Sequence, residues 1–397
     1  APLGSLIQSS DGKLYGMTSL GGTDAKGVIF RYDILTGTYE KLKDFNATDG
    51  SSPRGDLLEA ANGMMYGFTL NGGASNYGTM FSFDKTTLTY TKIQDLVFAN
   101  RNPTGSFIEA SSGLLYGVAS THLFQYNTST GVLNLLSGNG SGTPTEDQYG
   151  NIFFASRTSG GVLSKYSPFS GVSTAATFTS STALPNFSAG TYPCNGMLLA
   201  SDGLLYGVTS QGSSGNAGAL YTYGGSANSL RGLEIFDIRA RIGKSSAELV
   251  EVDKKLYGFG GGGKYNQGTI YRYDMLTDSV EVMVDMILFP GSVISTMNDL
   301  DLNFVKHPNG KLYCFIYCGG TANTGHLIEY VPGASTYTTI YNNSPTGGNI
   351  FNTKIRITVG QDGLLYGVTS NTGANNYGVL FSFDVVTNTF TVLHDFT

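Results

Sequence analysis

The segment from Asp299 to Asn303 carries side chains that could bind a metal ion. It reads Asp-Leu-Asp-Leu-Asn, so in an extended chain Asp299, Asp301 and Asn303 lie on one face. Calcium prefers such oxygen ligands, but it takes about six to eight of them. We therefore interpret the segment as the polar edge of a strand, with a calcium ion at Asp299 and Asp301 as the alternative.

Catalysis by a nucleophile or by a bound metal would need histidine or cysteine in groups, and this sequence is poor in both. The histidines are His122, His307, His326 and His394, and the cysteines are Cys194, Cys314 and Cys318. The run Gly260 to Gly263 lies between two expected strands and lacks the helix N-terminus of a phosphate-binding loop. The sequence predicts no catalytic residue, and no cofactor apart from the possible calcium ion.

Internal repeats occupy nearly the whole chain, so they must position any functional residue. The tripeptide Leu14 to Gly16 recurs near residues 65, 115, 205, 256 and 365, and degenerate copies lie near residues 152 and 312. The mean spacing is about 50 residues. Each copy contains four short stretches with the alternation of β-strands, separated by turns such as Asp11-Gly12 and Thr36-Gly37.

A four-stranded sheet cannot bury both of its faces alone, so successive sheets must stack. We predict an all-β fold, a single eight-bladed β-propeller of four-stranded antiparallel blades that forms one domain over residues 1–397. A pair of four-bladed rings is the alternative, and it would need a linker near the middle of the chain. The expected blades span approximately residues 4–45, 55–96, 105–137, 144–178, 196–238, 247–286, 302–341 and 354–396.

The order of elements within a repeat resembles that of kelch repeats. The second stretch ends in Gly21-Gly22 and the third closes with Tyr32-Asp33. The fourth stretch departs from the kelch pattern, because Tyr39 stands where kelch repeats usually have tryptophan.

A closer resemblance is to the GloVer tandem repeat, which is named after two bacterial groups. It rests on the segment Asp11 to Ser19, the pair Gly21-Gly22 and the segment Gly27 to Phe30, and it covers essentially the whole chain. The resemblance implies a β-propeller in an exported bacterial surface protein, and it carries no catalytic signature.

The longer connections follow the second and fourth stretches and share one face of the predicted propeller, which is the expected binding face. If the first stretch of each blade lines a central channel, the residue just before it surrounds the channel mouth. These residues are Ser5, Asp56, Ser106, Gly196, Glu248, Asn303 and Arg356. We interpret this ring as the solvated entrance of the channel, with a ligand site as the alternative. Any ligand is expected to bind there, with Asp56, Glu248, Asn303 and Arg356 as candidates. Arg356 stands out because a guanidinium suits carboxylate or sulfate groups.

Composition narrows the possible partners. The net charge of −6 has no long run of one sign, which argues against a nucleic acid or an anionic membrane surface as partner. No stretch approaches the ~18 consecutive apolar residues of a membrane helix, so we expect no membrane insertion.

The sequence favours a secreted or cell-surface binding protein whose ligand is a glycan or a protein. A polysaccharide-degrading enzyme of lyase type, with a tyrosine and an arginine at the channel mouth, is one alternative. A structural subunit or spacer of a surface assembly is another.

Overall fold

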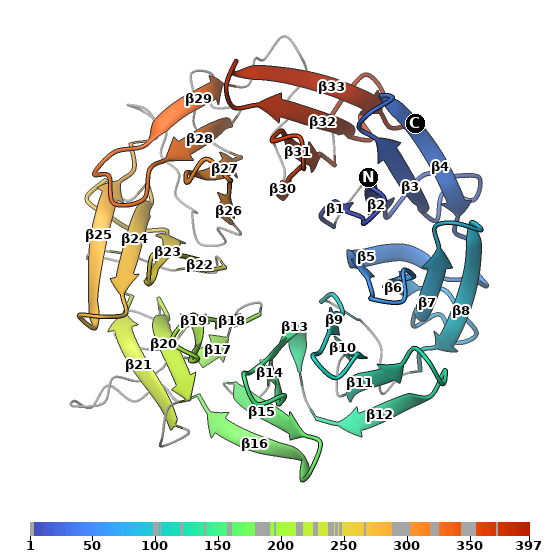
Figure 1. Ribbon diagram of the computed structural model, residues 1–397, viewed down its shortest axis with the longest axis horizontal. Helices are drawn as coiled ribbons and strands as arrows, with labels where there is room; N and C mark the ends of the chain where they lie inside the picture. The colour runs from blue at the N-terminus through green and yellow to red at the C-terminus, as the bar shows by residue number, and fades with distance from the viewer. Residues whose placement is uncertain are drawn as a thin grey trace. The chain divides into compact units, whose positions relative to one another are not determined.

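All regular elements of the described chain are β-strands, and they form eight sheets (Figure 1). The computed structural model describes residues 4–97, 103, 105–119, 122–138, 140–156, 161–178, 191–193, 196–211, 217–224, 229–236, 242, 245, 248–265, 267–287, 302–317, 325–342, 355–370 and 372–397. None of these residues belongs to a helix that could span a bilayer.

The first four blades follow one another along the chain. The first contains β1 (Ile7–Gln8), β2 (Leu14–Thr18), β3 (Val28–Asp33) and β4 (Thr38–Asp44). The second contains β5 (Ser51–Glu59), β6 (Met65–Asn71), β7 (Thr79–Asp84) and β8 (Thr89–Asp95). The third contains β9 (Ile108–Glu109), β10 (Leu114–Ala119), β11 (His122–Asn127) and β12 (Leu133–Ser137). The fourth contains β13 (Ser141–Glu146), β14 (Ile152–Ser156), β15 (Val162–Ser167) and β16 (Gly171–Thr177).

The remaining blades continue the same order. The fifth contains β17 (Thr191–Pro193), β18 (Leu198–Leu199), β19 (Leu205–Gln211), β20 (Ala219–Gly224) and β21 (Ser229–Ile235). The sixth contains β22 (Val250–Val252), β23 (Lys255–Gly260), β24 (Thr269–Asp274) and β25 (Ser279–Asp285). The seventh contains β26 (Val305–Lys306), β27 (Leu312–Ile316), β28 (His326–Tyr330) and β29 (Thr338–Asn342). The eighth contains β30 (Ile357–Val359), β31 (Leu365–Val368), β32 (Val379–Asp384) and β33 (Thr389–Asp395).

Neighbouring strands in each blade are antiparallel, and the fold is the predicted eight-bladed β-propeller. Seven sheets have four strands, and the fifth blade has five because its first strand is divided into β17 and β18. In the second blade the long strand β5 covers both parts, with a register shift between Arg54 and Leu58. The first strand of these two blades is therefore extended toward the loop that precedes it.

The chain divides into two compact units. One contains residues 1–137, 324–326 and 340–397, and the other contains residues 138–323 and 327–339. Within the first unit the eighth blade packs against the first, with Phe30, Leu380 and Phe396 in one buried cluster. The Thr358 hydroxyl also donates to the carbonyl oxygen of Leu6 at 2.6 Å.

The first blade has the eighth blade as a neighbour. Each of these two blades has its own four strands, so they join by packing, without a shared blade. A ring of blades one to four would instead make the fourth blade the neighbour of the first, so this contact argues against a pair of four-bladed rings.

The repeated tyrosine of the second strand lies between blades, and its hydroxyl is hydrogen-bonded, as is usual for a buried tyrosine. Tyr15 and Tyr66 are 0% and 3% exposed. The Tyr15 hydroxyl donates to Asp11 at 2.8 Å, and Tyr66 accepts a hydrogen bond from Asn62 at 2.9 Å. Burial raises the pKa of Tyr15 to about 12, and the hydrogen bond to Asp11 acts in the same direction. The turn before the second strand therefore supplies the partner of this buried hydroxyl.

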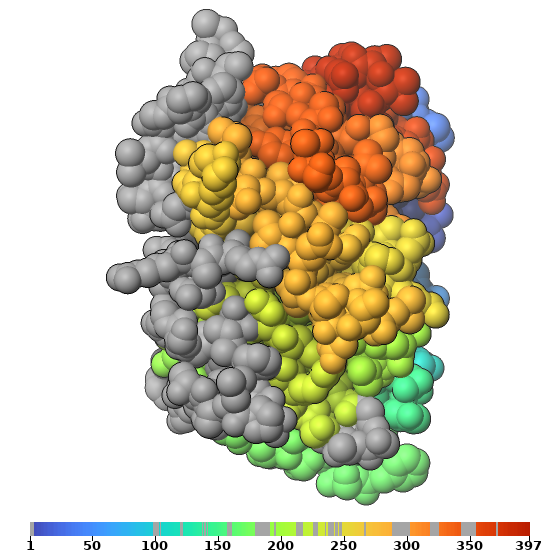
Figure 2. Space-filling view, turned by 90° about the vertical axis from the view of Figure 1, so that its left-hand side faces the viewer, coloured from blue at the N-terminus to red at the C-terminus, as the bar shows by residue number. Residues whose placement is uncertain are grey.

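The fourth strand of a blade has more exposed side chains than the third. In β25, Ser279, Glu281 and Asp285 are exposed, whereas most of β24 is buried. The sixth blade forms part of the surface shown in Figure 2, in yellow to orange. Loops joined to such rigid blades are suited to carry function.

Candidate functional site

Residues that precede or begin the first strands of four blades lie together in the first compact unit. Asp56 accepts a hydrogen bond from the backbone N–H of Ser5 at 2.5 Å and from the Ser106 hydroxyl at 3.2 Å. The backbone N–H of Asp56 donates to the same Ser106 hydroxyl at 2.9 Å. The Nη1 atom of Arg356 lies 3.9 Å from Oδ2 of Asp56. We call Ser5, Asp56, Ser106 and Arg356 the Asp56 cluster.

Glycine makes this convergence possible. A Cβ atom on Gly4 would lie 2.2 Å from the carbonyl oxygen of Gly55, and one on Gly55 would lie 2.8 Å from that of Gly105. Gly55 also has a φ of +80°, which favours glycine. The backbones of adjacent blades therefore approach more closely than a side chain permits. The repeated pairs Gly4-Ser5, Gly55-Asp56 and Gly105-Ser106 were a signal of this contact in the sequence, and the sequence analysis used only their second residues.

The charges of the cluster are only partly exposed to solvent. The side chain of Arg356 is 38% exposed and that of Asp56 is 26% exposed. At this exposure an ion pair contributes at most about 1 kcal/mol. A guanidinium has five N–H donors in a planar fork, which suits a carboxylate or sulfate group.

The other two candidates belong to the second compact unit. The side-chain oxygen of Asn303 accepts a hydrogen bond from the backbone N–H of Glu248 at 2.9 Å, and Glu248 is exposed. This contact resembles the one between Ser5 and Asp56. In both, a side-chain oxygen of one blade accepts a hydrogen bond from a backbone N–H of the preceding blade. Glu248 and Asn303 thus form a second, separate polar pair.

The calcium prediction concerns residues outside the described chain. Asp299 and Asp301 lie there, so the possible calcium site stays a prediction. The described residues contain no group of three or more His, Cys, Asp and Glu side chains that could hold a metal ion.

The other reactive side chains are engaged in packing or in local contacts. His394 stacks on Tyr39 with ring centroids 3.5 Å apart, and His307 accepts a hydrogen bond from the backbone N–H of Asn309 at 3.2 Å. Cys314 is buried, and this burial raises the pKa of its thiol. Cys194 and Cys318 lie outside the described residues.

A second repeated contact links the short turns of one blade to the first strand of the next. The backbone N–H of Ser10 donates to Glu59 at 2.8 Å, that of Ala61 donates to Glu109 at 2.8 Å, and that of Ser201 donates to Glu251 at 2.8 Å. Glu59 is also paired with Lys85. Burial alone would raise the pKa of Glu59, but hydrogen bonds from Lys85 and Ser10 lower it to about 2.

These turn contacts were missed by the sequence analysis. The signal in the sequence was an acidic residue near the end of the first strand in several repeats. The alternation of apolar and polar residues alone predicts only that this residue is exposed. Their role is to hold adjacent blades together, since each carboxylate satisfies a backbone donor of its neighbour.

Comparisons with known proteins identify the repeat. The Gloeobacter/Verrucomicrobia repeat matches residues 1–146 and 195–397. No curated protein matches the sequence.

Similar solved structures include two of one extracellular domain from B. thetaiotaomicron, described as part of a putative one-component system or of a putative hybrid two-component system. Each is 13% identical over 98% of this chain and 54% of that chain, with TM-scores of 0.38 and 0.39. The tricorn protease is 11% identical over 100% of this chain and 36% of that chain, with a TM-score of 0.36. The present chain thus spans about half the length of the first two.

Proposed function

This chain belongs to the Gloeobacter/Verrucomicrobia repeat family, and we propose that it is a non-catalytic binding propeller, secreted or at the cell surface, whose ligand is a glycan or a protein. The observation that carries the proposal is the Asp56 cluster, in which Asp56 is held by Ser5 and Ser106 of the adjacent blades and lies 3.9 Å from the guanidinium of Arg356. Convergent polar groups on a rigid scaffold are what a specific site requires.

Arg356 is the primary contact in this proposal. Its guanidinium binds a carboxylate or sulfate group of the ligand, and Asp56 accepts hydrogen bonds from neighbouring ligand hydroxyl or amide groups. Asp56 itself is held by Ser5 and Ser106, so its oxygens are oriented before the ligand arrives. Acidic glycans and acidic protein surfaces both offer the required groups.

The test begins with a glycan array and a set of acidic proteins, followed by affinity measurements with variants. Arg356→Ala should lower the affinity at least about tenfold, because a charge-assisted hydrogen bond is lost. The matched control is Lys13→Ala on the turn side, where Lys13 pairs with Asp33 at 2.8 Å. If the parent and Arg356→Ala bind the ligand with equal affinity, the Asp56 cluster is not the binding site.

Further outcomes separate the alternatives. New unsaturated ends on a bound polysaccharide would establish the lyase-type enzyme in place of a binding protein. Self-association without any ligand would favour the structural subunit. Glu248→Ala, tested separately, should lower the affinity if the pair of Glu248 and Asn303 also takes part in binding.

A further inference from the structure

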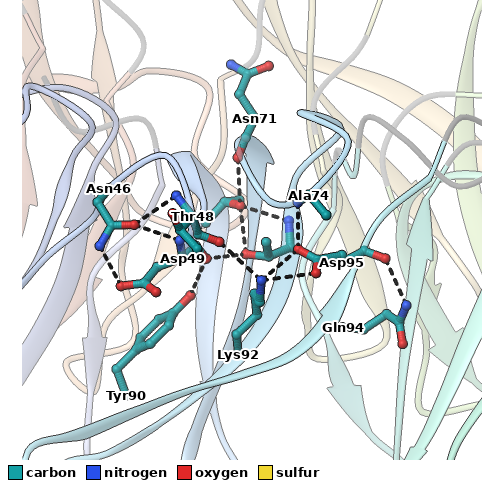
Figure 3. Close-up of polar contacts among 11 residues, drawn as sticks. Asn46, Thr48, Asp49, Asn71, Ala74, Tyr90, Lys92, Gln94 and Asp95 are labelled. Atoms are coloured by element: carbon teal, nitrogen blue, oxygen red, sulfur yellow. Dashed lines mark hydrogen bonds and ion pairs between the residues drawn. The ribbon is translucent and has the colours of Figure 1, made fainter.

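The loop between the first and second blades is held by side chains of the protein itself (Figure 3). The Tyr90 hydroxyl donates to the carbonyl oxygen of Asp49 at 2.7 Å, and the Lys92 ammonium donates to that of Thr48 at 3.2 Å. These polar groups serve the contact between blades. A further binding surface is better sought where large side chains stand in solvent.

Two aromatic side chains of the fourth blade stand in solvent. Phe169 is 100% exposed and Tyr149 is 77% exposed, so they are the most exposed aromatic side chains in the described part of the chain. Tyr149 lies in the turn between β13 and β14, and Phe169 lies in the turn between β15 and β16. We call Tyr149 and Phe169 the blade-four tips.

The two turns lie at the same end of one sheet. Its strand order is β13-β14-β15-β16. Glu146 is opposite Ile152, and Ile152 is opposite Tyr166. Ser167 is opposite Gly171 across the second turn. Neighbouring strands are about 4.8 Å apart, so the two turns are about 10 Å apart.

Local contacts fix the backbone of both turns. The backbone N–H of Tyr149 donates to the Asp147 carboxylate at 2.9 Å. Phe169 follows Pro168, whose ring fixes φ, and its backbone N–H donates to the Ser167 hydroxyl at 3.4 Å. Because the turns are formed in advance, a ligand that contacts the tips has little backbone to order.

The position of Tyr149 has a structural role in other blades. An aspartate or asparagine there is hydrogen-bonded to the buried tyrosine of the second strand, in the pairs Asp11–Tyr15, Asn62–Tyr66, Asp202–Tyr206, Asn309–Tyr313 and Asp362–Tyr366. In the fourth blade Phe153 replaces this tyrosine and has no hydroxyl to satisfy. The fold therefore does not use Tyr149 in this way.

The position of Phe169 accepts apolar residues without burying them. It is the second residue after the third strand, and the exposed residues at this position in the first, sixth and eighth blades are Leu35, Leu276 and Val386. The fourth blade is the one blade in the sequence with an aromatic residue at both turn positions. The pair of rings is thus a property of this blade.

The surroundings of the tips carry little charge. The exposed neighbours Gln148, Pro168 and Ser170 are uncharged. The ammonium of Lys165 in β15 lies over the ring of Phe153, 5.8 Å from its centroid. A single-stranded nucleic acid would need a positively charged groove, and an anionic membrane would need a cluster of lysine or arginine. The turns suit an uncharged ligand instead.

The size of the tips favours a slender ligand. A phenylalanine or tyrosine buries about 150–250 Å², so the two tips together cover about 300–500 Å². A specific protein interface buries about 800 Å² on each partner. A polysaccharide chain matches the smaller area, because its sugar rings present flat C–H faces. Its hydroxyl groups also suit the Gln148 amide and the Ser170 hydroxyl.

We propose that the blade-four tips bind an uncharged polysaccharide chain, with one sugar ring stacked on each tip. The negative face of an aromatic ring attracts the C–H groups of the sugar, and one chain spans the distance of about 10 Å between the turns. The Asp56 cluster belongs to the other compact unit and is proposed to bind anionic groups. The polysaccharide site does not depend on it.

The experiment measures binding of the full chain to hydroxyethyl cellulose, xyloglucan and galactomannan by affinity electrophoresis in native gels. Retardation by at least one of them is expected. Phe169→Ala and Tyr149→Ala should each raise the dissociation constant at least about fivefold, because one stacked ring is lost. Phe169→Leu should weaken binding as much as Phe169→Ala, because leucine is apolar but has no aromatic face. The matched control is Leu276→Ala, at the same position of the sixth blade, which should bind like the parent.

Further measurements separate this site from the Asp56 cluster. Arg356→Ala should leave the polysaccharide affinity unchanged, and a rise in NaCl from about 0.05 to about 0.5 M should change it less than about twofold, because no charge takes part. A loss in Arg356→Ala or a steep salt dependence would place the polysaccharide at the Asp56 cluster and overturn the proposal.

Other results would also overturn it. These are no retardation by any of the three polysaccharides, parent-like binding by Phe169→Ala, and parent-like binding by Phe169→Leu. Association with phosphatidylcholine vesicles or with a second copy of the chain that depends on Phe169, without polysaccharide binding, would assign the tips to another occupant.

Discussion

At the residue scale, the repeated tyrosine of the second strand links a turn to the core between two blades. Tyr66 packs against Tyr126 of the third blade with ring centroids 5.8 Å apart. Tyr66→Ala should lower the free energy of unfolding by about 3–5 kcal/mol, because a large buried side chain is lost. Denaturant unfolding measures the change. The fully exposed Phe169, replaced by alanine, is the control and should be neutral; an unchanged midpoint for Tyr66→Ala would contradict the packing role.

A second residue-scale prediction concerns the pH dependence of the pair Glu59 and Lys85. The pKa of Glu59 is lowered from 4.5 to about 2, so the group stabilises the fold above about pH 4.5 and loses this effect as the pH falls toward 2. Glu59→Gln should therefore be less stable than the parent at pH 7, with the difference shrinking in that window. Denaturant midpoints across pH 7 to 3 test it. In a Lys85→Met background the pH-dependent difference should be much smaller, and an undiminished difference would assign it to another group.

At the element scale, the start of the first strand depends on glycine. Gly55→Ala adds both a strained φ and a contact with the carbonyl oxygen of Gly105. Gly113 is the matched control, because its φ is +77° but no atom lies within 4 Å of its would-be Cβ. Gly113→Ala should cost about 1 kcal/mol for the backbone alone, and Gly55→Ala should cost clearly more. Equal costs would show that the blades can separate slightly without penalty.

At the scale of the whole molecule, the last blade joins the first by packing. Phe396 is 5% exposed and lies 5.3 Å from Phe30, and Phe45 occupies the same place between the first and second blades, 5.4 Å from Phe81. We expect Phe396→Ala and Phe45→Ala to destabilise the protein similarly, by about 3–5 kcal/mol each. Thermal or denaturant unfolding compares them. A much smaller loss for Phe396→Ala would mean that the two ends of the chain are held only loosely.

The candidate site could be predicted from the sequence only in part. The repeat assigned Asp56 and Arg356 to equivalent positions of their blades, just before the apolar start of the first strand. It did not reveal that Asp56 binds Ser5 and Ser106, or that Gly55 must be glycine for this contact. Those facts depend on the distance between blades, which no single repeat encodes.

The sequence by itself determined the fold class and the strands, because alternation and turn chemistry act over a few residues. Only the tertiary structure decided which groups meet between blades. Glu59 with Ser10, Arg356 with Asp56, and the loop at Asp49 with Tyr90 are all such contacts. The physical reason is that hydrogen bonds need partners within about 3.2 Å and ion pairs need partners within about 4 Å. This proximity arises only when complete blades pack face to face.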